Sequence, residues 1–186
     1  MRIIGGINKG KKINIPNDNR TRPLRDLVKE SIFNLIEHSN KFNTSILNSN
    51  ILDLFSGSGS FGLECYSRGA KLITFIENHS QALEILKKNI FILEATKSSK
   101  IIENNCFEYF KIDQNLKNRF DIIFLDPPYK ESKINYLIDR IKDEKLLRDN
   151  GILIIHRHKK DDVKITTKLN ILDIRNYGIS KIVIGN

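Results

Sequence analysis

The chain has 186 residues, of which 40% are hydrophobic and 28% charged, an ordinary composition for a globular protein with the core of one domain. Its formal net charge is +9, and residues 1–25 hold seven basic side chains against one acid, which favours a nucleic-acid partner. Two cysteines are too few for a disulfide framework, no signal peptide is visible, and no apolar run approaches the roughly 18 residues of a membrane span, so we expect a cytoplasmic protein without a membrane partner.

Residues 2–15 have the pattern of a β-hairpin. Two short apolar segments flank a turn around residues 8–10, and the second segment alternates between polar and apolar positions. A polar, basic link follows, and Pro23 then stands at the start of a predicted helix whose apolar residues recur at helical spacing. Residues 39–50 are rich in asparagine and serine and are predicted to form a loop.

From residue 51 onward, short apolar segments that suit strands alternate with segments of helical periodicity. This alternation predicts a parallel sheet covered by helices on both faces, with ligands at the carboxyl ends of the strands. The last part of the chain differs, because two apolar segments flank a turn and predict a closing hairpin with an antiparallel last strand. The predicted strands are residues 51–55, 71–76, 100–103, 121–125, 152–155, 163–174 and 179–184, and the predicted helices are residues 61–67, 80–95 and 134–147.

A glycine-rich loop follows the first of these strands. Residues 57–62 read Gly-Ser-Gly-Ser-Phe-Gly, which matches the dinucleotide-binding pattern, and Glu77 ends the next strand, 20 residues after Gly57. The glycines let the backbone approach a ligand closely, and the carboxylate can accept both hydroxyls of a ribose. A nicotinamide or flavin oxidoreductase therefore fits the glycine pattern itself.

Asp53 favours a different cofactor. It lies within the predicted strand, four residues before Gly57, where a carboxylate would repel a pyrophosphate. The same carboxylate would attract the ammonium and sulfonium groups of S-adenosylmethionine. The chain also lacks the Gly-Lys-Ser or Gly-Lys-Thr ending of a P-loop.

Two further positions fit an adenosine pocket. The Asn105 side chain could bind the adenine edge, although capping of the following short helix suits it equally well. The backbone N–H of Cys106 could serve a ring nitrogen, while its side chain suits a small buried position.

The residues Asp126-Pro127-Pro128-Tyr129 directly follow four apolar residues of a predicted strand. Each proline has a fixed φ and no N–H, so this stretch offers mainly oxygen acceptors in a rigid frame. Asp126 and the carbonyl of Pro127 could hold both N–H bonds of a nucleobase amino group, while Tyr129 stacks on the ring, which is worth roughly 1–3 kcal/mol. The base must be unpaired or flipped out to reach such a pocket. The other interpretation is a proline-terminated strand that ends in a solvated acid.

The sequence lacks the residues that several other kinds of chemistry require. No Pro-Cys dipeptide is present, which argues against carbon-5 methylation through a cysteine nucleophile. No pair of histidines has ligand spacing beside an acid, so no metal site is predicted. We interpret the basic run at residues 156–160 as a solvated face that contacts phosphate, and a minor role for His156 at the pocket rim stays open.

With these residues in place, the chain resembles the bacterial 16S ribosomal RNA guanine-N2 methyltransferases (RsmD-type enzymes), which are class I S-adenosylmethionine-dependent methyltransferases. The resemblance covers almost the whole chain and is most specific at Arg22-Pro23 and at residues 26–34, Asp-Leu-Val-Lys-Glu-Ser-Ile-Phe-Asn. Two positions depart from the family pattern. Leu24 stands where threonine is usual, and His156 stands where a glutamate commonly ends the fifth strand.

The resemblance implies a Rossmann-like α/β fold with a seven-stranded, mostly parallel sheet in the order 3-2-1-4-5-7-6 and an antiparallel last strand. It implies that residues 1–20 are a basic β-hairpin extension that acts as an RNA arm, and that residues 21–186 are the methyltransferase domain. The implied reaction methylates N2 of a guanine in small-subunit ribosomal RNA, with the small subunit as partner, and we expect a monomer. An adenine-N6 methyltransferase and a non-catalytic RNA-binding assembly factor remain alternatives.

The residues predicted to form the site fall into three sets. The catalytic set is Asp126, Pro127 and Tyr129. The cofactor-binding set is Asp53, Phe55, Ser56, Gly57, Gly59, Glu77, Asn78, Asn105, Cys106 and Asp126. The RNA-binding set is Arg2, Lys9, Lys11, Lys12, Arg20, Arg22 and Arg25.

Overall fold

The computed structural model describes residues 1–17, 24–109, 119–128, 131–161 and 163–186. The strands are β1 (Asn50–Leu54), β2 (Leu72–Glu77), β3 (Ser99–Glu103), β4 (Phe120–Leu125), β5 (Leu147–His158), β6 (Ile171–Tyr177) and β7 (Ser180–Gly185). The helices are α1 (Asp26–His38), α2 (Ser60–Ser67), α3 (Ser80–Ile92), α4 (Cys106–Tyr109) and α5 (Ile134–Asp143), with a 3-10 turn η1 (Thr96–Ser98).

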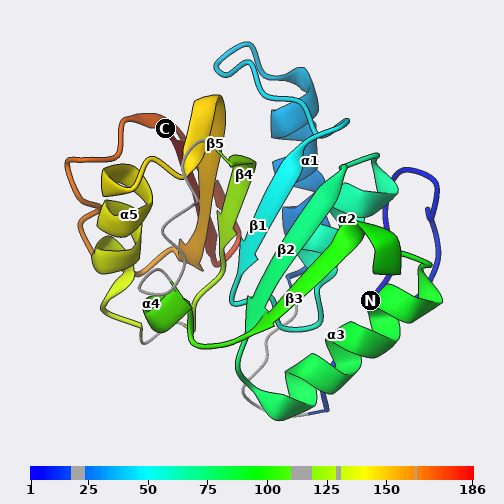
Figure 1. Ribbon diagram of the computed structural model, residues 1–186. Helices are drawn as coiled ribbons and strands as arrows, with labels where there is room; N and C mark the ends of the chain where they lie inside the picture. Colours follow the sequence, from blue (N-terminus) through cyan, green and yellow to red (C-terminus); the bar gives the residue numbers. More distant parts are fainter. Residues whose placement is uncertain (18–23, 110–118, 129–130, 162) are drawn as a thin grey trace.

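Within the described residues these strands form a seven-stranded sheet in the order β3-β2-β1-β4-β5-β7-β6, which confirms the expected order. The pairs from β3 to β5 are parallel, and β7 runs antiparallel to both β5 and β6, as expected. Figure 1 shows α1, α2 and α3 on one side of the sheet and α4 and α5 on the other.

The strand residues alternate between two hydrophobic cores. In β4, Ile122 and Phe124 pack with α1, α2 and α3, whereas Ile123 and Leu125 pack with α4 and α5. The central strands β1 and β5 divide their apolar residues between the same two cores. Because successive side chains of a strand point to opposite faces, a strand covered on both faces needs an uninterrupted apolar run. This requirement explains the short apolar runs of the sequence.

The first turn of α2 packs closely against β2 and α3 because two glycines leave room for them. A Cβ at Gly62 would lie 2.4 Å from Cε1 of Phe75, and a Cβ at Gly59 would lie 2.4 Å from Cδ1 of Leu86. The N–H of Gly62 donates to Asp53 at 3.0 Å. The glycine spacing is therefore explained in part by packing that brings the first turn of α2 to the carboxyl end of β1.

The N-terminal segment does not form the predicted β-hairpin. Residues 1–17 contain no strand, and the two halves of the segment meet at an isolated antiparallel bridge between Arg2 and Lys12. Backbone hydrogen bonds beside this bridge join Ile3 to Lys11 at 2.9 Å and Ile13 to Met1 at 3.0 Å. The next N–H groups, of Ile4 and Gly5, donate to the carboxylate of Glu64 in α2 at 2.8 and 2.7 Å, so the pairing does not extend into the two strands that the sequence predicts.

Glu64 also forms an ion pair beneath this segment. Its side chain and that of Lys29 are both 0% exposed, and Nζ of Lys29 lies 3.5 Å from Oε2 of Glu64. The Lys29 amine donates to the carbonyl of Arg2 at 2.7 Å, and Arg68 donates to Glu64 at 3.0 Å. Burial lowers the pKa of Lys29, and the charge of Glu64 opposes this shift. The N-terminal segment is therefore anchored to the core of the domain.

Several predicted boundaries are also wrong, among them the ends of two helices and the start of one strand. Helix α3 ends at Ile92 and α5 ends at Asp143, each earlier than expected, and β6 begins at Ile171. Glu94 and Lys145 follow the two helices with φ of 58° and 51°. These are left-handed residues that commonly end helices, but neither is the glycine that would signal such an end in the sequence.

Candidate active site

Three carboxylates lie at the carboxyl ends of neighbouring strands. Asp53 is in β1, Glu77 ends β2 and Asp126 follows β4, and β1 pairs with both of the other strands. Burial raises the pKa of Asp53 well above its ordinary value; the Gly62 N–H opposes this, and the charges of Asp126 and Glu77 raise it further. Within the described part of the chain no group of three or more His, Cys, Asp or Glu side chains could hold a metal ion. Three neighbouring acids suit an organic cation, as predicted for S-adenosylmethionine.

Glu77 is held by backbone N–H groups. Its Oε1 accepts from Asn78 and His79 at 2.9 and 2.8 Å, and its Oε2 accepts from Gly57 at 2.7 Å. An ionised carboxylate has about four acceptor positions, so about one remains on Oε2 in this conformation. Binding both hydroxyls of a ribose would require Glu77 to release one N–H, and the assignment stays a prediction.

The loop after β1 has the backbone conformation that its glycines allow. Gly57 and Gly59 have φ of 54° and 79°. Phe55 also has a positive φ, 61°, which costs a non-glycine residue about 1–3 kcal/mol and is common at functional sites. The hydroxyl of Ser56 is used within the fold, where it donates to the carbonyl of Asp53 at 2.6 Å. The backbone N–H of Ser56 donates to the carbonyl of Ile76 at 3.1 Å, so this residue is bonded within the fold and its contact with a cofactor stays a prediction.

The two predicted adenine contacts lie at the start of α4. Oδ1 of Asn105 accepts from the N–H of Phe107 at 2.9 Å, so its side chain has the capping role that the sequence left open. Burial raises the pKa of the Cys106 thiol to about 12; a backbone hydrogen bond from Phe55 opposes the shift, and the charges of Glu77 and Asp53 add to it. Cys106 therefore lies beside the acids as a protonated, buried side chain. Adenine binding by either residue stays a prediction.

Asp126 is not a solvated acid at the end of a strand. Its side chain is 21% exposed, and Oδ1 lies 2.7 Å from Nδ1 of His156. The other ring nitrogen, Nε2, lies 2.9 Å from Oγ of Ser180 at the start of β7. The adjacent Pro127 is buried. The predicted catalytic acid is thus fixed in place by side chains from β5 and β7.

The basic run at residues 156–160 is not solvated throughout, which corrects that interpretation. His156 and Arg157 are 7% and 2% exposed, whereas Lys159 and Lys160 are exposed. The prediction failed because it ended the strand at residue 155, while β5 continues to His158. A longer strand would have placed the first two side chains on opposite faces of the sheet.

Arg157 and Ser180 were not among the predicted site residues. Arg157 donates from Nη1 to the carbonyl of Pro128 at 3.3 Å and from Nη2 to that of Glu131 at 3.1 Å, and its Nε pairs with Asp161. No local pattern in the sequence marks the contacts with Pro128 and Glu131, because these two partners come from a distant segment.

Some predicted residues lie outside the described chain, namely Tyr129, Arg20 and Arg22. The other predicted RNA-binding residues are exposed: Arg2, Lys9, Lys11, Lys12 and Arg25. Arg2 lies 3.7 Å from Asp26 in a solvent-exposed ion pair. No helix in the described ranges combines the length and the hydrophobicity of a membrane span.

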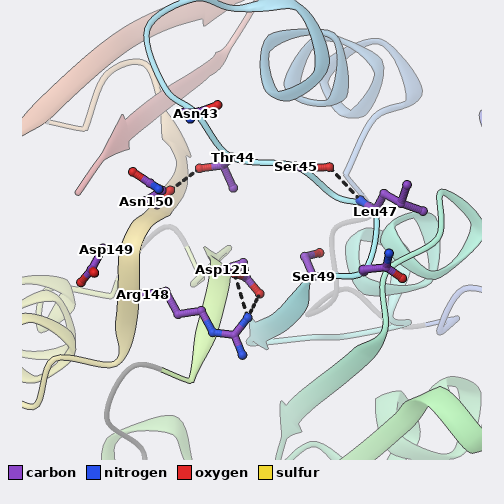
Figure 2. Close-up of a pocket in the computed structure, with 10 residues that line it drawn as sticks. Asn43, Thr44, Ser45, Leu47, Ser49, Asp121, Arg148, Asp149 and Asn150 are labelled. Atoms are coloured by element: carbon purple, nitrogen blue, oxygen red, sulfur yellow. Dashed lines mark hydrogen bonds and ion pairs between the residues drawn. The ribbon is translucent and has the colours of Figure 1, made fainter.

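A separate hollow of about 520 Å³ lies at the opposite edge of the sheet (Figure 2). It lies between the loop before β1 and the start of β5, where Arg148 pairs with Asp121 at 2.9 Å and the hydroxyl of Thr44 donates to the carbonyl of Asn150. Because the three acids stand at the carboxyl ends of the strands and this hollow at the amino ends, it is distinct from the candidate active site.

Comparison with known proteins places the chain in a family. The model of the family described as "Conserved hypothetical protein 95" matches residues 1–186. The chain belongs to this family. YlbH from Bacillus subtilis (strain 168) is 32% identical over 185 residues, which cover 99% of this chain and 97% of YlbH. The "Ribosomal RNA small subunit methyltransferase D" of Haemophilus influenzae is 31% identical over 180 residues, which cover 96% of this chain and 90% of that protein.

Solved structures agree with this assignment. The Escherichia coli protein yhhF superimposes with a TM-score of 0.83 and 25% identity, over 100% of this chain and 96% of that chain. The family consists of S-adenosylmethionine-dependent rRNA methyltransferases, so the predicted enzyme class and cofactor are confirmed. The three acids at the carboxyl edge of the sheet fit this cationic cofactor, and a nicotinamide or flavin oxidoreductase is excluded.

Proposed function

We propose that the protein transfers a methyl group from S-adenosylmethionine to the N2 amine of a guanine in small-subunit ribosomal RNA. The observation that carries this proposal is the placement of Asp126, a partly exposed carboxylate held beside the acids of the cofactor site. The small-subunit RNA substrate is supported by relatives such as the Haemophilus influenzae protein. On this proposal residues 1–20 contact RNA and residues 21–186 form the catalytic domain.

Residues of the protein align the target amine and provide the electrostatic surroundings of the methyl donor. The bound cofactor supplies an electrophilic methyl group. Asp126 accepts one N–H of the guanine amine on the oxygen that His156 leaves free, and the carbonyl of Pro127 accepts the other. Holding both hydrogens turns the nitrogen lone pair out of the ring plane, toward the incoming methyl group. Asp53 and Glu77 provide the negative surroundings that a sulfonium favours.

The decisive experiment is transfer of a labelled methyl group to small ribosomal subunits that lack the modification, followed by digestion to nucleosides. Label in N2-methylguanosine is expected. Label in N6-methyladenosine would support the adenine alternative instead. Binding of S-adenosylhomocysteine without any transfer would support the non-catalytic assembly factor. Subunits that already carry the modification serve as the control and should take up no label.

Replacing Lys9, Lys11 and Lys12 with glutamine is expected to weaken RNA binding and reduce its salt dependence. Each contact between a lysine and a phosphate releases counterions, so loss of three contacts should reduce the slope of log K against log salt by about 2. Substitution is preferable to deletion, because the backbone of this segment is bonded to Glu64. The measurement is RNA affinity across a salt series.

The matched control removes three exposed lysines near the amino ends of β2, β3 and β5, outside the N-terminal segment: Lys71, Lys100 and Lys145. The change in net charge is the same, so a general electrostatic effect would appear in both variants. Equal salt slopes in the two variants would reject a specific role for the N-terminal segment.

A further inference from the structure

Two consecutive residues of β5 contact the acid-proline corner, by which we mean residues 126–128. Leu125 at the end of β4 pairs with Ile155 of β5. The next two residues of β5, His156 and Arg157, therefore stand at the level of the corner. Because neighbouring side chains of a strand point to opposite faces, the two residues reach the corner from two sides.

His156 holds the carboxylate. An ionised carboxylate only accepts hydrogen bonds, so Nδ1–H of His156 donates to Oδ1 of Asp126, 2.7 Å away. In the neutral tautomer protonated at Nδ1, Nε2 accepts from the hydroxyl of Ser180, whose Oγ lies 2.9 Å away. Both ring nitrogens of a side chain that is 7% exposed are therefore used. This fixes the tautomer, the ring plane and the rotation of the Asp126 side chain.

Arg157 holds the backbone of the same corner. Its guanidinium donates to the carbonyls of Pro128 and Glu131, at 3.3 and 3.1 Å, and the residue is 2% exposed. Arg157 and the prolines fix the backbone of the corner. The hydrogen bond from His156 is therefore not needed to hold the backbone, and it orients the Asp126 carboxylate.

The order Ser180-His156-Asp126 also resembles the triad of a hydrolase. Ser180, however, is 4% exposed and lies within the paired end of β7. A nucleophile must reach its substrate, and this hydroxyl is enclosed. Asp126 is the most exposed of the three residues, so the hydrogen bonds from Ser180 through His156 orient the Asp126 carboxylate.

We propose that His156 is a positioning residue for methyl transfer. By occupying Oδ1 of Asp126 it leaves Oδ2 to accept an N–H of the target amine in a single orientation. This inference rests on the proposed function, because it assigns the acid the role of amine acceptor. Residues that hydrogen-bond to an essential side chain and orient it typically contribute about 10–100-fold to the activity of the site.

The test compares two substitutions that differ in one hydrogen bond. His156→Phe keeps a ring but removes the donor, and we expect kcat to fall about 10–100-fold with KM for the ribosomal subunit within about threefold. His156→Asn places an N–H near the position of Nδ1, and we expect it to keep kcat within about threefold of the wild type. Equal losses in the two variants, unchanged kcat in His156→Phe, or a loss carried entirely by KM would each overturn the proposal.

A second measurement needs no substrate. Nitrogen NMR of the imidazole in the folded protein is expected to show the neutral tautomer protonated at Nδ1, and Asp126→Ala is expected to abolish that preference. Protonation at Nε2 in the wild type would overturn the positioning role, whatever the nucleoside assay shows. Methylation of adenine in place of guanine would defeat the proposed function but would leave the His156 comparison intact.

Discussion

Replacing Asp126 with alanine is expected to lower kcat for methyl transfer by about 10²–10³-fold, the usual effect of removing one oriented group that stabilises a transition state. The amine would lose the acceptor that holds one of its hydrogens, and its lone pair would return toward the ring plane. Affinity for S-adenosylhomocysteine is expected to change less than about threefold, because Asp53 and Glu77 remain. Single-turnover transfer and calorimetry measure the two quantities separately.

The matched control is Asp121→Ala, at the other end of β4. Asp121 also accepts a backbone N–H, that of Asn50 at 2.7 Å, and pairs with Arg148, but it lies at the amino edge of the sheet. Its removal should reduce stability and leave kcat close to that of the wild type. Retained turnover in Asp126→Ala would contradict the assigned role. A parallel loss of S-adenosylhomocysteine binding would instead assign Asp126 to the cofactor.

The sheet could be predicted because its residues are constrained locally. The central strands β1, β4 and β5 are covered on both faces and carry runs of apolar residues, and the turn between β6 and β7 separates two further strands. The acids could be predicted for a related reason. Parallel strands place their carboxyl ends at one edge, so Asp53, Glu77 and Asp126 had to be neighbours once the strand order was known.

The contacts that the sequence did not reveal are those between distant segments. Glu64, which accepts from the N-terminal segment, is 60 residues from Ile4, and His156 is 30 residues from Asp126. Local alternation predicted strands at residues 2–15, but the pairing stops at a single bridge, and the N–H groups that follow it donate to a buried carboxylate on α2. The local pattern of a single sequence does not show which distant acceptor a given N–H group will bind.

Replacing Glu64 with glutamine is expected to destabilise the fold by about 3–5 kcal/mol, the typical loss when one partner of a buried ion pair is removed. Glutamine keeps the size of the side chain and one acceptor oxygen, so the loss combines the missing charge with one N–H, of Ile4 or Gly5, that loses its acceptor. Lys29 would be left charged in a site with 0% exposure. The free energy of unfolding in urea at about pH 7 gives the value by linear extrapolation.

Adding Lys29→Met to this variant is expected to recover part of the loss, because it removes the unpaired charge and leaves an apolar chain of similar length. Most substitutions destabilise a protein, so a second substitution that raises the stability of Glu64→Gln would identify the unpaired charge of Lys29 as the cause of the loss. Glu30→Gln, at an exposed neighbouring position of α1, is the control and should stay within about 0.5 kcal/mol of the wild type. A double variant less stable than Glu64→Gln would contradict the interpretation.

The pH dependence of stability provides an independent check on whether the charge of Lys29 causes the loss of stability in Glu64→Gln. Burial already lowers the pKa of Lys29 below 10.5, and Glu64 opposes that shift, so its removal should lower the pKa further. Between the folded and unfolded pKa values the unfolded chain binds more protons, so stability rises with pH there, by at most about 1.4 kcal/mol per unit. The deficit of Glu64→Gln should therefore shrink as the pH rises toward 10.5, whereas that of the double variant should not. A deficit that stays constant in the single variant would mean that Lys29 is not the buried charge that destabilises it.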